Sequence, residues 1–425
     1  MNRRYFFASA LPALAANAQK KAAASERLRV GLIGCGGRGR FVAGFLQKFG
    51  DVDITAVSDV ASSRLDQARQ ELVGAYQSKS PDGYEDYRRI LDRKDIDAVI
   101  VATNHHWHSA PFLEACAANK QIYVEKPLGF SIGEGRLMVE AAKKYETRAM
   151  VGTQQHGVDQ FVRAVEIVRS GKLGEIPLVE CWNLHPYGPR AGKHPVTAPP
   201  LGMNWDRWLG PAPMAPYQES RLRSNWWFDY SGGMMTDWAT HHFDIVCWAM
   251  QAYDPIEVTC TGEKTVTKDD ADCPDLIHAS WKFPKFTATY RYRGFNYFHP
   301  VQNRTRDHGI IFYGTRATLI VDRYGLELWT ENEKNPKEKL EDMPKPATEA
   351  VWYRAFVDYA KGLRDSPYDF EKSHRSTSVC HLANIAYHVK RPIQWNAQSE
   401  QIEHDAEANA MILAKRREGY ELPKV

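Results

Sequence analysis

A glycine-rich turn near residue 34 constrains the fold of this chain more than any other feature. Residues 28–33 are short, apolar and β-prone, which is typical of a buried parallel strand. A G-x-G-x-x-G follows directly, and apolar residues then recur at helical spacing over 41–46. In that context Gly34 permits a tight turn, Gly36 lets the backbone approach a pyrophosphate, and Gly39 lets the helix pack close to the strand. The N–H groups at the helix start then bind the anion, so the turn predicts a dinucleotide site.

The next predicted strand indicates which dinucleotide is bound. Residues 53–59 are β-prone and end in Asp59, 20 positions after Gly39. A carboxylate there accepts hydrogen bonds from both ribose hydroxyls and repels a 2′-phosphate, which favours NAD over NADP. Arg64 lies nearby and could accommodate a phosphate, so NADP stays open as the less favoured alternative.

Strands and helices continue to alternate after Asp59, which indicates a parallel, doubly wound sheet. Strands are predicted at 98–103 and 121–124, with a helix from Ser109 to Ala118 between them. The loops after these strands face the ligand crevice. Three histidines crowd the first loop in a geometry that suits a metal poorly, so we expect no metal. The predicted cofactor-binding residues are Gly34, Gly36, Gly37, Arg38, Gly39, Asp59, Thr103, Asn104, His105, Trp107, His108, Glu125 and Lys126.

Composition excludes several classes of protein. The 55 basic and 52 acidic side chains give a net charge of only +3, and no block of like charges occurs, so we expect no nucleic-acid partner. No apolar run approaches the roughly 20 residues of a membrane span. The seven cysteines include no C-x-x-C, which argues against a disulfide framework and a structural zinc site.

The first 24 residues resemble a twin-arginine export signal. Arg3-Arg4 precede aromatic residues and an Ala-rich apolar stretch, and residues 16–18 match a small-x-small cleavage pattern. We therefore expect an exported, periplasmic protein; the alternative is a disordered start with an accidental arginine pair. The expected organisation is a signal at 1–24, a Rossmann domain at 25–150 and a substrate-binding domain at 151–425.

Several motifs together resemble the Gfo/Idh/MocA (glucose–fructose oxidoreductase/inositol dehydrogenase) family over the whole mature chain. They lie at 34–39, 59, 102–108, 125–127, 171–176, 204–211, 232–241 and 381–386. The resemblance implies a Rossmann domain and a second α/β domain with an open, mainly antiparallel sheet. Members are often homo-oligomers through that sheet.

The later chain is compatible with such a sheet. Residues 277–283 and 287–292 alternate between apolar and polar side chains, and 309–321 predicts a hairpin around Gly314. Residues 331–349 are rich in Lys, Glu and Pro and predict a solvated loop. Helices are expected at 349–364 and 373–389.

The resemblance also implies a catalytic set of Lys126, Asp237 and His241. Residues 236–249 predict one helix, on which positions four apart share a face, so Asp237 and His241 can act together. His241 would carry a proton, Asp237 would orient it or bond the substrate, and Lys126 would stabilise charge on the reacting oxygen. The alternative for the pair is an ordinary helix start with a buried polar contact.

Aromatic and polar residues near this helix suggest a sugar pocket. Sugar C–H faces stack on aromatic rings while the hydroxyls need hydrogen-bonding side chains. The candidate substrate residues are Tyr187, Arg223, Trp226, Trp227 and His242, with core packing as the alternative for each.

We therefore expect an NAD(P)-dependent oxidoreductase acting on CH–OH groups of a small-molecule carbohydrate. An exported enzyme has no free nicotinamide pool, so its cofactor would be tightly bound and recycled on the protein. The alternative is an NAD-dependent glycosidase that oxidises, eliminates and re-reduces its substrate. The Thr236–His242 run is closer to the dehydrogenase pattern. A third reading, a non-catalytic dinucleotide sensor, would need no acid/base set.

Overall fold

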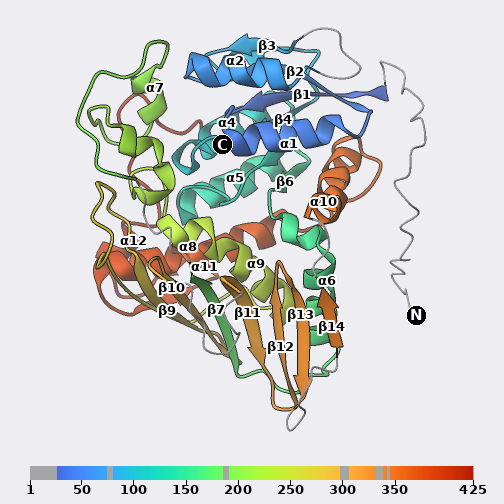
Figure 1. Cartoon of the computed structure of the whole chain (residues 1–425), viewed down its shortest axis with the longest axis vertical. Coiled ribbons are helices and arrows are strands. Elements are labelled where there is room, and N and C mark those ends of the chain that lie inside the picture. Colours follow the sequence, from blue (N-terminus) through green and yellow to red (C-terminus); the bar gives the residue numbers. More distant parts are fainter. Residues whose placement is uncertain are drawn as a thin grey trace.

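The computed structural model describes residues 26–73, 80–184, 191–296, 306–330, 338–341 and 345–424. The predicted export signal and the candidate substrate residue Tyr187 lie outside the described residues. Within these ranges the strands form two sheets, of six and ten strands, in the upper and lower halves of Figure 1. No helix within these ranges has the length and apolarity that a membrane crossing needs.

The first sheet is parallel throughout and has the order β3-β2-β1-β4-β5-β6. Because helices cover both faces, strands such as β4 are buried along their whole length. The order reverses between β1 and β4, which places a ligand crevice at the carboxyl ends of those two strands. The predicted doubly wound sheet is confirmed. Its strands are β1 (Leu28–Ile33), β2 (Val52–Ser58), β3 (Asp82–Tyr84), β4 (Ala98–Val101), β5 (Gln121–Val124) and β6 (Ala149–Val151).

Five helices accompany this sheet: α1 (Gly37–Gln47), α2 (Ser62–Glu71), α3 (Arg88–Leu91), α4 (Ser109–Ala117) and α5 (Ile132–Lys144). The glycine turn joins β1 to α1. Gly34 has φ +94°, and a Cβ there would lie 2.6 Å from the Ala102 carbonyl oxygen. A Cβ on Gly39 would lie 2.1 Å from the Gly34 carbonyl oxygen. The turn and the close packing of α1 on β1 therefore both require glycine.

The second sheet has the order β14-β13-β12-β11-β7-β10-β9-β8-β15-β16. Among the described strands of this sheet only β7 and β10 pair in parallel, so the predicted mainly antiparallel sheet is confirmed. Its strands are β7 (Leu178–Leu184), β8 (Glu257–Glu263), β9 (Leu276–Lys282), β10 (Thr287–Arg293), β11 (His308–Tyr313), β12 (Ala317–Asp322), β13 (Gly325–Thr330), β14 (Glu338–Glu341), β15 (Ile393–Asn396) and β16 (Gln401–Ile402).

One face of this sheet packs on helices and forms the larger apolar core. The helices that follow β6 in the sequence are α6 (Asp159–Arg169), α7 (Trp205–Leu209), α8 (Gly233–Asp237), α9 (Ala239–Met250), α10 (Lys345–Ala360), α11 (Phe370–Val389) and α12 (Ala406–Asn409). Of these, α6, α8, α9, α11 and α12 contribute to that core. The opposite face carries a smaller cluster around Trp182 and Ile311.

The predicted loop at 331–349 is wrong in part. Residues Glu338–Glu341 form β14, which pairs with β13, and α10 begins at Lys345 rather than 349. Backbone pairing with β13 stabilises a strand that its charged sequence does not indicate. Trp352, Tyr353 and Phe356 of α10 pack into the core of the first sheet. That long-range burial fixes where the helix lies.

The last residues also return to the N-terminal half, where Figure 1 marks the C-terminus. We call residues 412–424 the C-terminal strap. The Gly133 N–H donates to the Ile412 carbonyl at 2.8 Å, and the Ala414 N–H donates to Ser131 Oγ at 3.2 Å. The strap thus lies along the start of α5, beside the ligand crevice.

Candidate active site

Two adjoining cavities run along the glycine turn. The first encloses about 360 Å³ and lies at the ends of β1, β2 and β4; the second encloses about 400 Å³ and lies between the two sheets. Gly36, Ala102, Thr103 and Asn104 line both cavities. A dinucleotide has two nucleoside halves joined by a pyrophosphate, so the paired cavities suit one molecule that passes over the turn.

The turn itself is open to an approaching phosphate. A Cβ built on Gly36 or Gly37 meets nothing within 4 Å. Both glycines lie at the start of α1, where N–H groups lack partners in the helix. The residues present therefore fit a bound pyrophosphate.

Asp59 is fixed at the wall of the first cavity. Its Oδ2 accepts from the Cys35 N–H and its Oδ1 from the Ala61 N–H, each at 2.9 Å. Burial raises the pKa of this carboxyl group. Arg64 lines the same cavity. A carboxylate held here suits ribose hydroxyls, while the choice between NAD and NADP stays a prediction.

The three histidines after β4 connect loops around the crevice. The two ring nitrogens of His108 lie 2.9 Å from the Pro127 carbonyl oxygen and 3.1 Å from that of Thr103. His105 Nδ1 lies 3.0 Å from Ser231 Oγ, and His106 Nε2 lies 3.3 Å from the Trp208 carbonyl oxygen. Across the described ranges no three His, Cys, Asp or Glu side chains are grouped to hold a metal ion.

The structure brings most predicted cofactor residues to these cavities. Gly39 instead lies under the turn, where α1 meets β1. The others line one cavity or both: Gly34, Gly36, Gly37, Arg38, Asp59, Thr103, Asn104, His105, Trp107, His108, Glu125 and Lys126.

Lys126 and Asp237 meet at the wall of the second cavity. Lys126 follows β5 and Asp237 ends α8, so one comes from each half of the molecule. Lys126 Nζ donates to Asp237 Oδ1 and to the Asp237 carbonyl oxygen, both at 2.6 Å. The two side chains are 14% and 22% exposed, which leaves the pair open to the cavity.

This contact breaks the single helix predicted for 236–249. In a continuous helix the Asp237 carbonyl would accept from the N–H of residue 241. Lys126 Nζ occupies that carbonyl instead, and Thr240 Oγ1 also donates to it at 3.3 Å. The His241 N–H bonds the Trp238 carbonyl at 3.0 Å. The chain therefore forms α8 and α9 with Trp238 between them.

His241 lies in α9 and lines the same cavity. It is only 6% exposed, and its Nδ1 is buried without a hydrogen-bond partner. Asp237 therefore does not orient the ring through Nδ1. Burial, together with the charges of Lys126 and Arg323, holds the pKa of His241 well below its usual value. A neutral imidazole is the form that accepts a proton.

The candidate substrate residues are placed differently. Among the described residues, neither Arg223, Trp226, Trp227 nor His242 lines the second cavity. Arg223 is exposed, and Trp226 packs between two apolar clusters. Trp227 Nε1 donates to the Ser220 carbonyl at 3.0 Å, and His242 Nε2 lies 3.0 Å from Asn183 Oδ1. Their role in substrate binding stays a prediction.

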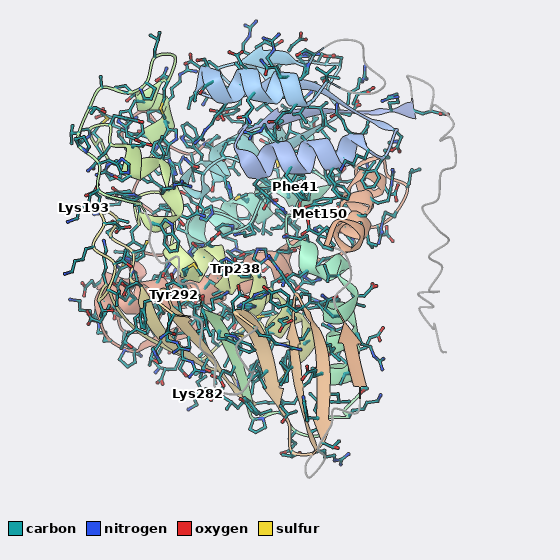
Figure 2. All side chains as sticks on the ribbon, in the orientation of Figure 1. Phe41, Met150, Lys193, Trp238, Lys282 and Tyr292 are labelled. Atoms are coloured by element: carbon teal, nitrogen blue, oxygen red, sulfur yellow. The ribbon has the colours of Figure 1, made fainter. Side chains whose placement is uncertain are left out.

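Five residues that line the second cavity are not among the predicted site residues: Ala102, Gln154, Asn225, Trp238 and Arg323. Figure 2 shows Trp238 between the two halves of the molecule. Asn225 lies between the predicted substrate residues Arg223 and Trp226, which was a usable signal. Arg323 lies in the turn after a predicted hairpin, where nothing local marks it as a cavity residue.

The fold defines a protein of two α/β parts, the first with the parallel sheet and glycine turn of a Rossmann nucleotide-binding domain. Family profiles agree in both halves. The profile of the oxidoreductase family's NAD-binding Rossmann fold matches residues 28–153, and that of its C-terminal alpha/beta domain matches residues 182–422. The chain therefore belongs to the Gfo/Idh/MocA oxidoreductase family, as its motifs indicated.

Individual relatives resemble shorter stretches. Glycosyl hydrolase family 109 protein 1 of Shewanella sp. (strain MR-4) is 30% identical over 165 residues, which are 38% of this chain and 36% of that protein. Myo-inositol 2-dehydrogenase of Thermotoga maritima is 28% identical over 148 residues, 35% of this chain and 42% of that protein. This chain thus spans well under half of either relative's length.

A solved structure extends the likeness in fold to most of the chain. Levoglucosan dehydrogenase in complex with NADH and levoglucosan has a TM-score of 0.66 and covers 87% of this chain and 99% of its own. Its sequence identity is 15%, so the likeness concerns the fold.

Proposed function

We propose that this protein is an NAD-dependent oxidoreductase that acts on a CH–OH group of a sugar or sugar derivative. One observation carries the proposal: Lys126, Asp237 and His241 line a single cavity that continues along the glycine turn. A nucleotide laid over the turn reaches the cavity that holds these three side chains. Bound NAD supplies the hydride acceptor.

Lys126 is suited to stabilise charge on the reacting oxygen. Its ammonium group is held by Asp237 at 2.6 Å but uses only part of its donor capacity there, since an ammonium has three N–H groups. As the carbinol C–H bond breaks, negative charge builds on the oxygen, and a fixed cation lowers the energy of that state. Asp237 positions Lys126 by binding it through both carbonyl and carboxylate oxygens.

His241 is suited to take the hydroxyl proton. Its imidazole is neutral at neutral pH because burial opposes the charged form. The ring sits on α9, a helix packed in the main core, so its position is fixed. Loss of a positioned general base typically lowers the rate by about 10²- to 10⁴-fold.

The C-terminal strap supports a tightly held cofactor. Arg416, Gly419, Tyr420 and Glu421 line the first cavity, opposite the sheet. Tyr420 also packs edge-on against Trp107, with ring centroids 5.7 Å apart. A nucleotide in this cavity would be covered by the strap, which favours slow release and recycling of the cofactor on the protein.

We also propose that the protein is exported. Arg3-Arg4 and the apolar stretch that follows support this. Cell fractionation of Arg3→Lys/Arg4→Lys should find the variant retained in the cytoplasm while the parent chain reaches the periplasm. Equal distribution of both chains would contradict export by the twin-arginine route.

A second candidate function is NAD-dependent glycoside hydrolysis. The resemblance to Glycosyl hydrolase family 109 protein 1 favours it. In that reaction transient oxidation acidifies a neighbouring C–H, and His241 would be the base that starts elimination.

A panel of free sugars and aryl glycosides separates the two candidates. Purified protein is mixed with each compound, without an external oxidant, and the near-ultraviolet absorbance of reduced nicotinamide is followed together with aryl release. Reduction by a free sugar, followed by reoxidation with a second sugar, supports the oxidoreductase. Steady aryl release supports the hydrolase. The absence of both signals would refute both candidate functions.

A further inference from the structure

Arg323 brings a positive charge into the second cavity from the C-terminal sheet. It occupies the turn between β12 and β13, whose backbone conformation is fixed by hydrogen bonds. Asp322, fully buried, accepts from the N–H groups of Tyr324 and Gly325 at 2.7 and 3.0 Å. The Arg323 carbonyl accepts from Gln160 Nε2 at 3.2 Å. The backbone that presents this guanidinium is therefore fixed.

The Arg323 guanidinium has partners for only part of its surface. Its guanidinium lies over the Trp238 ring, 4.5 Å from the centroid, and both residues line the cavity. Its Nη2 is buried and has no hydrogen-bond partner. A buried charged donor without an acceptor is costly, and most such groups in proteins are paired. This group is thus arranged to meet an acceptor that enters the cavity.

The other charges around the cavity are already matched. Arg38 Nε donates to Glu125 Oε1 at 2.8 Å, so its charge is paired although its Nη2, like that of Arg323, has no hydrogen-bond partner, and Lys126 pairs with Asp237 at 2.6 Å. Burial lowers the pKa of His105, His108 and His241, so these rings add no charge at neutral pH. Among the described residues that line this cavity, Arg323 is the cation without a carboxylate within 4.0 Å, and Glu349, Asp237 and Asp307 act on its charge only from farther away.

We propose that Arg323 binds a carboxylate of the substrate, so that the enzyme acts on sugar acids such as hexuronates rather than on neutral sugars. The inference rests on the proposed function and specifies its substrate. A guanidinium offers parallel N–H groups that match a carboxylate. A phosphate ester carries nearly two negative charges and would find only one unmatched cation.

The cofactor's pyrophosphate is the competing partner for Arg323. The glycine turn and the start of α1 already provide its site from the N-terminal half, whereas Arg323 enters from the other half with its guanidinium over the Trp238 ring. A substrate carboxylate has a further consequence. It would offset one of the positive charges that, after burial, lower the pKa of His241, and so would make that ring a better base.

The test measures matched acidic and neutral sugars on the parent chain and on two full-length variants. The sugars are glucuronate with glucose, galacturonate with galactose, and glucose 6-phosphate. Arg323→Gln is compared with Arg316→Gln, an exposed arginine on the neighbouring hairpin turn. Reduction of bound nucleotide gives kcat/KM for each sugar, and denaturation gives the nucleotide content.

The parent chain should prefer each hexuronate over its hexose by at least about 10-fold in kcat/KM. Arg323→Gln should erase that preference, mainly through KM, and leave the nucleotide content unchanged. Arg316→Gln should match the parent. Preference for neutral hexoses would overturn the inference while the proposed function stands. Preference for the phosphate, or loss of nucleotide from Arg323→Gln, would overturn it too. Failure of every sugar would refute both proposals.

Discussion

Replacing Arg416 with Met should release the cofactor, because Arg416 anchors the C-terminal strap. Arg416 Nη1 donates to Glu134 Oε1 at 2.7 Å, and the two side chains are 8% and 0% exposed. Removing one member of a buried ion pair leaves the other uncompensated, at a cost of about 3–5 kcal/mol. If local detachment of the strap exposes Glu134 to water and so relieves that cost, the equilibrium constant for detachment rises by roughly 100-fold or more.

Arg417→Met is the matched control. Arg417 bonds Asp206, which is 60% exposed, so its ion pair contributes at most about 1 kcal/mol. Each variant is loaded with NAD, moved into nucleotide-free buffer, and sampled over time for retained nucleotide. Arg416→Met should lose NAD about 10- to 100-fold faster than the parent, and Arg417→Met no more than a few-fold faster.

A second variant tests whether the uncompensated carboxylate is what opens the strap. In Arg416→Met/Glu134→Gln that carboxylate is gone, so both the melting temperature and most of the NAD retention should recover. Equal retention by the parent and Arg416→Met would refute the role of the strap. Equal loss from Arg416→Met and Arg417→Met would refute the assignment to the buried ion pair.

Four further predictions follow from the site and the turn. Lys126→Met should abolish turnover yet keep bound nucleotide; an active variant would remove Lys126 from the mechanism. His241→Asn should lower kcat by about 10²- to 10⁴-fold without changing nucleotide content, and loss of nucleotide would count against its role as base. Burial lowers the pKa of His106 to about 3, so below pH 6.5 the unfolded chain binds a proton at this residue that the folded chain does not. Urea titration at pH 5 should therefore find that this residue lowers the free energy of unfolding by about 2 kcal/mol relative to neutral pH, and His106→Phe should weaken this dependence on pH. Gly39→Ala should unfold at lower temperature because its Cβ would lie 2.1 Å from a backbone oxygen, whereas Gly37→Ala should melt like the parent; similar melting of both would contradict this packing.

The nucleotide half of the protein could be predicted because its signals are local. The strand, the glycine turn and the helix that follows each carry their own pattern, and Asp59 falls where the next strand ends. The turn's function depends on backbone geometry that only glycine permits at Gly34 and Gly39. Spacing along the sequence therefore determines this part of the fold.

Other features of the fold depend on contacts between residues far apart in the sequence, which local sequence patterns do not indicate. The break at Trp238 arises because Lys126, more than a hundred residues away, takes the carbonyl that a continuous helix would use. Arg323 reaches the cavity only because a ten-stranded sheet brings its turn there. The strand β14 forms by pairing with β13 despite its charged sequence. Each of these results from tertiary structure that overrides local preference.

Transfer of deuterium from substrate to cofactor is the most direct sign of the proposed oxidation. The sugar that best reduces the bound nucleotide is prepared with deuterium on every carbon and mixed with purified protein, without added cofactor. The protein is then denatured, and the released nucleotide is identified by mass spectrometry. If the sugar donates the hydride, the released nucleotide should be reduced NAD that carries one deuterium. Protein without nucleotide, or a nucleotide that gains no deuterium from any sugar, would contradict the proposed oxidation.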